Sequence, residues 1–239
     1  ANIIAFGQPF AAYLYPAAFL TDPGDPGGWL WIAQFVLIDG KMRGLFTLLF
    51  GAGMVLFMEK AWEKGATRWL QAWRLIILLG FGMVHFFFIW PGDILAFYAL
   101  YGLIALLCMR WSSKVQLVAG LGGYMLGVVV YLGLSFPWAI VETSLGESTR
   151  EMRAQRAGLI AEIDTALARD AVPSALIRAG DYAGLVAHRI TEQWSEPLQN
   201  AVLFGFETLP LMLIGMALYR LGFFTGGIAR AKLLRWGWV

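Results

Sequence analysis

The sequence holds one cysteine, two histidines and few charged residues among its 239 positions. The single Cys108 excludes an intrachain disulfide framework and a cysteine-based zinc site. His85 and His188 lie far apart, and neither an HExxH nor a CxxC pattern occurs, so we predict no metal site. Charged residues make up only 14% of the chain, whereas soluble domains carry about 25%. This shortage argues against a soluble enzyme and against a nucleic-acid partner.

Apolar residues, by contrast, make up 59% of the chain, and its mean hydropathy is +0.65. A chain with so little polar surface needs lipid as its solvent, so we expect the bilayer to be its main partner. In lipid the backbone must satisfy its own hydrogen bonds, which favours helices. We therefore predict an all-α fold, a polytopic transmembrane helical bundle. Five segments approach the ~20 residues that a span needs: 41–58, 69–90, 94–111, 115–136 and 201–222.

Outside these spans the sequence predicts one water-facing region and two cut ends. Residues 1–7 read as the tail of an earlier span and 235–239 as the start of another, so we expect a single transmembrane domain over 1–239, truncated at both ends. Residues 29–38 are predicted to lie along the membrane interface before the chain enters it.

The water-facing region is 137–200, predicted to be a helical insertion outside the cytoplasm. Ser148 and Glu151 have the spacing of a capping box, and apolar residues then recur at helical intervals. Pro173 is predicted to break this helix. A second helix is expected over 182–194.

The distribution of basic residues predicts the topology. Residues 59–68, 110–114 and 230–235 are rich in lysine and arginine, which places them on the cytoplasmic side by the positive-inside rule. The turn at 90–93 has no basic residue and falls on the opposite side, together with 137–200. Lys41 and Arg43 lie at the outer end of a span and count mildly against this orientation.

Ionisable side chains inside apolar spans are costly and are therefore functional candidates. Arg74 and His85 share a helix, and eleven residues return to nearly the same face with a rise of ~16 Å. They would mark two depths of one groove. Asp93 follows the turn at 90–92 and could fold back toward the histidine. The complete set of candidates is Lys41, Arg74, His85, Asp93, Glu207 and Arg220.

Each candidate also has a structural interpretation, and these alternatives stay open. Arg74 and Arg220 could extend their charges to the cytoplasmic surface, and Lys41 could be an interfacial anchor. His85 could be a satisfied core residue, and Asp93 could cap the helix that starts at Ile94. Glu207 is harder to explain, because a buried carboxylate needs a partner. Lys41 and His85 lie at suitable depths for that role.

Chemically, His85 with a carboxylate, Asp93 or Glu207, is a minimal general-base pair. Arg74 could bind phosphate groups of a donor, and Lys41 and Arg220 are further candidate substrate contacts. A histidine between a donor on one side and an acceptor on the other suits acyl transfer across a membrane. The same residues would also suit a proton-coupled transporter.

Small residues follow two of the spans, and their ordinary meaning is close helix packing. No phosphate loop is expected at 51–53, since no strand precedes it and no Lys-Ser/Thr pair follows. The glycines concerned are Gly44, Gly51, Gly53, Gly80 and Gly82.

Several motifs together resemble those of the YeiB-like bacterial inner-membrane proteins. NIIAFG at 2–7 and AAYLYP at 11–16 resemble the loop after that family's first span. Lys41 with LFTLLFGAG at 45–53 is similar to its second-span signature. The strongest resemblance combines RLIILLG at 74–80, His85, WPGDIL at 90–95 and Tyr98. LIG at 213–215 with Arg220 and Gly222 resembles a later span.

This resemblance implies a multi-pass protein of the bacterial inner membrane. In that membrane, the side to which the basic residues assign the turn 90–93 and the region 137–200 is the periplasmic side. The family is remotely similar to the transmembrane acyltransferases, such as heparan-alpha-glucosaminide N-acetyltransferase. It therefore implies acyl transfer from a CoA-type donor substrate to an extra-cytoplasmic acceptor, with no tightly bound cofactor. That enzyme's catalytic histidine lies in the loop after its first span, and the corresponding loop here has none, so the role falls to His85. The alternatives are a transporter, or a non-catalytic subunit in a homo-oligomer or larger membrane complex.

Overall fold

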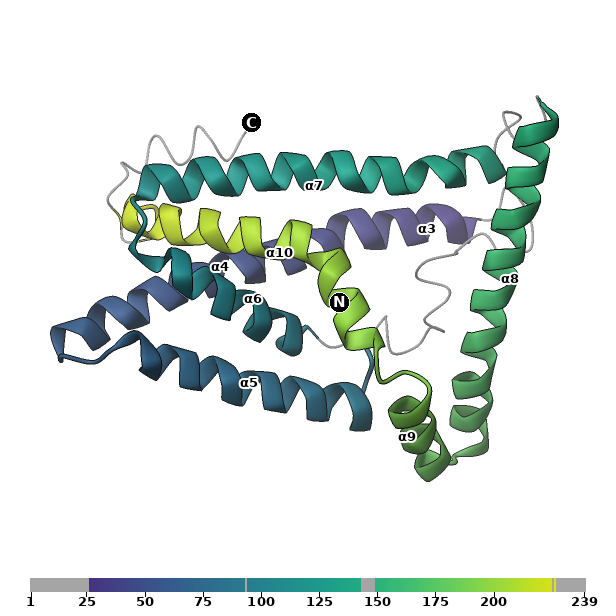
Figure 1. The fold of residues 1–239 in the computed structure, drawn as a ribbon, viewed down its shortest axis with the longest axis horizontal. Helices are drawn as coiled ribbons and strands as arrows, with labels where there is room; N and C mark the ends of the chain where they lie inside the picture. Colours follow the sequence, from purple (N-terminus) through teal and green to yellow (C-terminus); the bar gives the residue numbers. More distant parts are fainter. Residues whose placement is uncertain (1–25, 93, 143–148, 225, 227–239) are drawn as a thin grey trace. The chain divides into compact units, whose positions relative to one another are not determined.

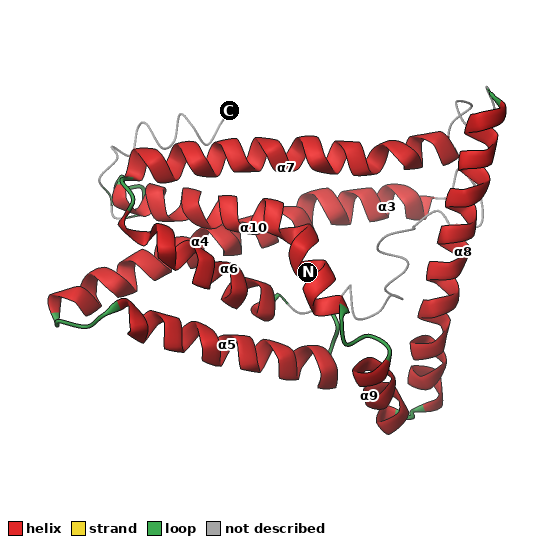
Figure 2. Cartoon of the chain, in the orientation of Figure 1, coloured by secondary structure: helices red, strands yellow, loops and turns green. Residues whose placement is uncertain are grey.

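The computed structural model describes residues 26–92, 94–142, 149–224 and 226. Every regular element in these ranges is helical (Figure 2), which confirms the all-α prediction. The segments predicted at 1–7 and 235–239, the motifs at 2–16, the basic residues at 230–235 and Asp93 lie outside them. In chain order (Figure 1), the elements are α3 (Pro26–Gln34), the π-helix η2 (Phe35–Asp39), α4 (Gly40–Glu63), α5 (Arg68–Phe88), α6 (Leu95–Leu107), the 3-10 helix η3 (Cys108–Arg110), α7 (Ser113–Glu142), α8 (Arg150–Ala179), α9 (Tyr182–Thr191) and α10 (Glu196–Arg220).

The chain divides into two compact units, and each of them is built from two separate stretches of sequence. Unit 1 comprises 1–42 and 128–193, and unit 2 comprises 43–127 and 194–239. The division falls inside α4 and α7 rather than at the predicted boundaries of the insertion, 137 and 200. The single transmembrane domain with one insertion stays a prediction.

Four helical stretches in the described residues are long and apolar enough to cross a membrane. They are Gly27–Glu63, Arg68–Phe88, Ser113–Leu134 and Glu196–Arg220. The span predicted at 94–111 is wrong in length, because the apolar helix Leu95–Arg110 is shorter than a full span and its α-helical part ends at Leu107. Residues 29–38 are helical and lead without a break through η2 into α4, so they belong to a candidate span instead of a separate interfacial segment.

In unit 1, α8 and α9 correct two details of the predicted insertion. The N-cap of α8 is Thr149, whose hydroxyl accepts a hydrogen bond from the amide of Met152 at 3.1 Å, rather than Ser148. The break predicted at Pro173 is wrong, since α8 continues through it. No described residue of α8 is buried, so the carbonyl that the proline leaves unbonded can face water. The second helix is confirmed, with Asp181 as its N-cap, but it ends at Thr191 rather than at residue 194. Burial lowers the pKa of Arg189 on this helix.

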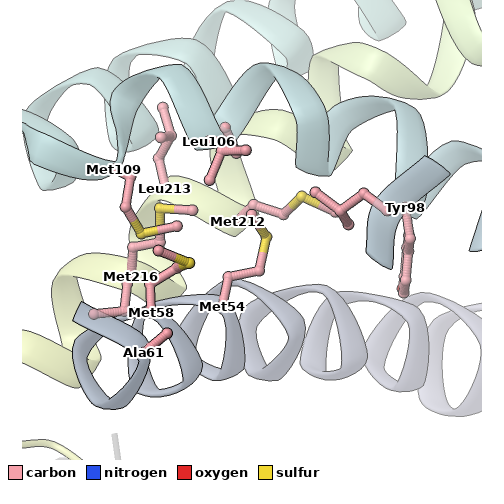
Figure 3. Close-up of a cluster of buried hydrophobic side chains, with 12 residues drawn as sticks. Met54, Met58, Ala61, Tyr98, Leu106, Met109, Met212, Leu213 and Met216 are labelled. Carbon is pink, nitrogen blue, oxygen red and sulfur yellow. The ribbon is translucent and has the colours of Figure 1, made fainter. Parts of the chain in front are cut away.

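In unit 2, α6 lies between α5 and α10 and packs against both (Figure 1). Its core is rich in methionine, a flexible side chain that fills irregular gaps between helices. Figure 3 shows Met54 and Met58 of α4 facing Met212 and Met216 of α10, with Met109 beside them. Met58, Met109, Met212 and Met216 are fully buried. This core fixes the register of α4 and α10, on which the polar residues described below are placed.

Glycines set the closest contacts within unit 2, and only some of the predicted ones do so. A β-carbon at Gly51 would meet the backbone of Met212, and one at Gly82 would meet the backbone of Ala96. Nothing lies within 4 Å of the same position at Gly53 or Gly80. Close packing is therefore confirmed at Gly51 and Gly82. Three glycines that carried no prediction, Gly120, Gly123 and Gly127, lie on α7 against α10.

Candidate functional site

A charged pair joins α4 to α10 in unit 2. The Arg43 guanidinium donates from Nη2 to Oε2 of Glu207 at 3.0 Å and from Nε to Oε1 at 3.4 Å. Two parallel bonds between a guanidinium and a carboxylate give the strongest geometry available to such a pair. The side chains are 32% and 16% exposed, so the pair is largely covered by the protein.

Glu207 lies well inside α10, and Arg43, although near the start of α4, lies inside the continuous helical stretch Gly27–Glu63. Glu207 stands eleven residues after Glu196 and thirteen before Arg220 on α10, which corresponds to ~17 Å and ~20 Å of helix. Arg43 precedes the end of α4 at Glu63 by twenty residues, or ~30 Å. If α10 spans the bilayer, whose apolar core is ~30 Å thick, both charges lie within hydrocarbon.

Hydroxyl and aromatic groups surround this pair. The Thr47 hydroxyl donates to the carbonyl of Arg43 at 2.8 Å and lies 2.8 Å from the Tyr98 hydroxyl, which also donates to that carbonyl at 3.2 Å. The Arg43 guanidinium stands over the Phe204 ring, 5.2 Å from its centroid. We call Arg43, Thr47, Tyr98, Phe204 and Glu207 the polar centre. It draws on α4, α6 and α10.

The spacing of the sequence explains why the centre forms. Arg43, Thr47 and Gly51 are four residues apart, so they share one face of α4, and Gly51 packs directly against the backbone of Met212 on α10. Sequence reasoning missed Arg43 as a site residue and treated it as a charge at the outer end of a span. The signal was available in this spacing and in the need of Glu207 for a cation. Arg43 takes the role for which Lys41 and His85 were considered.

Arg220 is tied into the fold at the end of α10. Its guanidinium donates to the carbonyls of Met109 at 2.6 Å and Trp111 at 2.8 Å and to Oε1 of Gln116 at 3.2 Å, and it lies 3.9 Å from Glu59. These bonds satisfy carbonyls at the end of η3 that the helix leaves unpaired. A substrate contact by Arg220 stays a prediction.

The other predicted cations are both exposed. The Arg74 guanidinium stands over the Phe57 ring, 3.8 Å from its centroid, and donates to Gln71 at 3.3 Å. Lys41 stands near the start of α4. Neither residue belongs to the polar centre.

His85 lies near the end of α5 and is half-buried, with Nδ1 inaccessible to solvent. Its carbonyl accepts hydrogen bonds from the amides of Ile89 and Trp90, where the helix ends. Ile94 occupies the N-cap position of α6 and makes no side-chain cap bond. Because Asp93 lies outside the described residues, its proposed pairing with His85 stays a prediction.

Fold and site together define an all-helical protein in which a charged pair is held between helices of membrane-spanning length. In agreement with this, the chain is 30% identical over 245 residues to the uncharacterized protein YeiB of Escherichia coli (strain K12), a match that covers 100% of this chain and 56% of the relative. This similarity confirms the resemblance to the YeiB-like family.

Two further relatives match shorter stretches. The chain is 43% identical over 101 residues to the uncharacterized protein YxaH of Bacillus subtilis (strain 168), which covers 41% of this chain and 25% of the relative. It is 34% identical over 89 residues to an uncharacterized 39.9 kDa protein of Bacillus acidopullulyticus, which covers 36% and 25%. The chain thus spans about half or less of the length of these relatives. No protein-family model and no solved structure matches it.

Proposed function

We propose that the chain is the membrane-embedded part of an acyltransferase-like protein of the bacterial inner membrane. It would move an acyl group from a CoA-type donor to an extra-cytoplasmic acceptor. The observation that supports this function best is the polar centre, because a charged pair inside apolar helices is costly unless it serves a task. The sequence motifs resemble those of the YeiB-like family, and the remote similarity of that family to the transmembrane acyltransferases gives the reaction class.

In this proposal His85 is the general base. It takes the proton from a hydroxyl or amine of the acceptor while that atom attacks the thioester carbonyl carbon of the donor. The C–S bond then breaks, and the departing thiolate receives the proton from His85. Asp93 is the proposed partner that orients the imidazole, and Arg74 the proposed contact to donor phosphates.

In this proposal Glu207 positions Arg43, whereas the sequence analysis considered it as the carboxylate that orients His85. Its carboxylate holds the Arg43 guanidinium through two bonds, so it acts as a positioning residue. Arg43 in turn offers a positive charge to the negative oxygen that develops during attack on the thioester. Lys41 and Arg220 remain proposed contacts to the substrates outside the centre.

The test is acyl transfer or acyl-CoA hydrolysis by the purified full-length protein in membranes. His85→Ala should lower kcat at least a hundredfold, because general acid–base catalysis contributes about 10²–10⁴-fold. His188→Ala is the matched control, since His188 is the other histidine and lies on α9. An unchanged rate in His85→Ala would remove the assignment.

A proton-coupled transporter is the second candidate, and the shape of the helices favours it. The π-helix η2 interrupts the α-helical pattern just before Arg43, and α10 contains Pro210 three residues after Glu207 although it continues through it. Transporters place broken helices next to their charged sites. Proton-driven uptake into proteoliposomes without a covalent product, lost in Glu207→Gln and kept in His85→Ala, would favour this function over acyl transfer.

A further inference from the structure

One end of unit 2 gathers most of its cations. The turn between α4 and α5 and the turn between η3 and α7 both lie there. Arg220 connects the two turns, because it donates hydrogen bonds to the carbonyls of Met109 and Trp111 at η3 and lies near Glu59 at the end of α4. Arg110 adds a second link, since it stands over the Trp62 ring at 5.9 Å. We call this surface the basic end; besides Arg220 its cations are Lys60, Lys64, Arg68, Arg110 and Lys114.

The charges of the basic end are unbalanced and accessible. Glu59 and Glu63 are the acidic residues in the same stretches, and Glu59 lies against Arg220. Lys60, Lys64, Arg110 and Lys114 are all exposed. The sequence stretches 89–94 and 194–200, which join α5 to α6 and lead into α10, contain no lysine or arginine. Positive charge is therefore concentrated at one end of the unit.

Exposed tryptophans accompany these cations. Trp69, Trp73 and Trp111 are 67%, 53% and 43% exposed, although tryptophan is usually well covered in water-soluble folds. Tryptophan rings favour the boundary between hydrocarbon and headgroups. Cations and tryptophans at the same end of helices of spanning length match a leaflet surface, with the rings at the boundary and the charges among the headgroups.

We propose that the basic end is a binding surface for the phosphates of anionic phospholipid headgroups. Lysine and arginine form charge-assisted hydrogen bonds with phosphate oxygens. In an anionic headgroup the negative charge of the phosphate is not balanced by a cation of the same headgroup, as it is in a zwitterionic lipid. The basic end should therefore prefer anionic lipids. The inference does not rest on acyl transfer, because it requires only that unit 2 spans a bilayer.

The first test compares two lipids on the full-length protein in a neutral detergent. Phosphatidylglycerol is added to one sample and phosphatidylcholine with the same acyl chains to another, and thermal unfolding and native mass spectrometry are recorded. We expect phosphatidylglycerol to raise Tm more than phosphatidylcholine and to remain bound, with the difference shrinking in high salt. Equal shifts and equal retention of the two lipids would overturn the proposal without any variant.

The second test locates the surface. The variant K60Q/K64Q/R110Q/K114Q should bind phosphatidylglycerol at least roughly tenfold more weakly, since each basic residue near an anionic surface adds about 1 kcal/mol. The control R150Q/R153Q/R169Q/R178Q removes the same charge from exposed positions of α8 and should retain the wild-type preference. An equal loss in both variants would mean that net charge alone attracts the lipid, and the proposed surface would be wrong.

Discussion

A β-carbon on Gly215 would clash with the carbonyl oxygen of Leu48, and one on Gly51 would clash with the carbonyl oxygen of Met212. The two helices α4 and α10 thus meet backbone to backbone at two points, with one glycine contributed by each. Such contacts are typical of helices that associate in lipid, where small residues permit close van der Waals packing. The polar centre lies beside this contact, which sets the distance between α4 and α10 at that point.

The first prediction concerns this contact. Gly51→Ala should destabilise the full-length protein by about 2 kcal/mol, because the added methyl group meets backbone atoms that cannot rotate away. Gly53→Ala is its control two residues along, where nothing lies within 4 Å. That change should be neutral or stabilising by up to about 1 kcal/mol, since alanine favours helix. Denaturant unfolding in detergent measures both, and equal effects would contradict the contact.

A second pair of glycines tests the same argument between α5 and α6. Gly82→Ala should destabilise, because a β-carbon there meets the backbone of Ala96. Gly80→Ala should not, since its β-carbon would point into open space. Thermal unfolding of the two variants side by side measures the difference. The reverse order of stability would mean that α5 faces α6 with another side.

The Arg43–Glu207 pair is expected to be energetically coupled. Exposed pairs contribute about 0.2–1 kcal/mol and loss of one partner of a buried pair costs about 3–5 kcal/mol. For this partly covered pair we expect Arg43→Met and Glu207→Gln each to cost about 2 kcal/mol. The double variant should lose clearly less than the two single losses together, which unfolding of all four proteins measures. Lys41→Met, at an exposed position on the same helix, is the control and should change little. Strict additivity would argue against a direct interaction.

Arg220 provides a prediction about geometry rather than charge. Arg220→Lys keeps the positive charge near Glu59 but cannot reach Met109, Trp111 and Gln116 at once. We expect it to destabilise by about 2 kcal/mol, nearly as much as Arg220→Met, because a bond to a charged donor contributes about 1.5–3 kcal/mol. Full stability of the lysine variant would show that charge alone suffices.

The hydroxyl pair beside the polar centre is expected to act as a unit. Tyr98→Phe should cost about 1 kcal/mol, because it removes the bonds to Thr47 and to the Arg43 carbonyl. Thr47→Val removes the bond between the two hydroxyls and leaves Tyr98 with the Arg43 carbonyl as its hydrogen-bond partner. Tyr101→Phe, which loses a bond to the Ala201 carbonyl elsewhere in the unit, serves for comparison. In a double-mutant cycle the Thr47 and Tyr98 changes should be non-additive, while Thr47 and Tyr101 should add.

The spans could be predicted from the sequence because their signal is local. Continuous apolar runs identify α5, α7 and α10, since hydropathy alone decides whether a segment of that length prefers lipid. The residues at which the helices begin and end were harder to predict from the sequence. The α-helical run that starts at Leu95 ends at Leu107 although apolar residues continue, because a 3-10 turn follows whose carbonyls Arg220 satisfies from another helix.

The predictions for Arg43 and Pro173 failed for the same reason. In both cases the surrounding structure, rather than the local sequence pattern, determines the role of the residue. Arg43 read as a terminal charge because the span was predicted to begin at residue 41, but α3 and η2 precede it and place Arg43 inside a longer helical stretch. Pro173 read as a break, but α8 continues through it and no described residue of α8 is buried. Its partner carbonyl can therefore bond to water.

The separation of Arg43 and Glu207 by 164 positions has a consequence during synthesis. A ribosome that adds about 5–20 residues per second delivers the carboxylate roughly 10–30 seconds after the guanidinium. For that interval the nascent α4 carries a cation whose eventual counterion does not yet exist. The insertion machinery, or water that accompanies the arginine, has to stabilise this charge until α10 is synthesised.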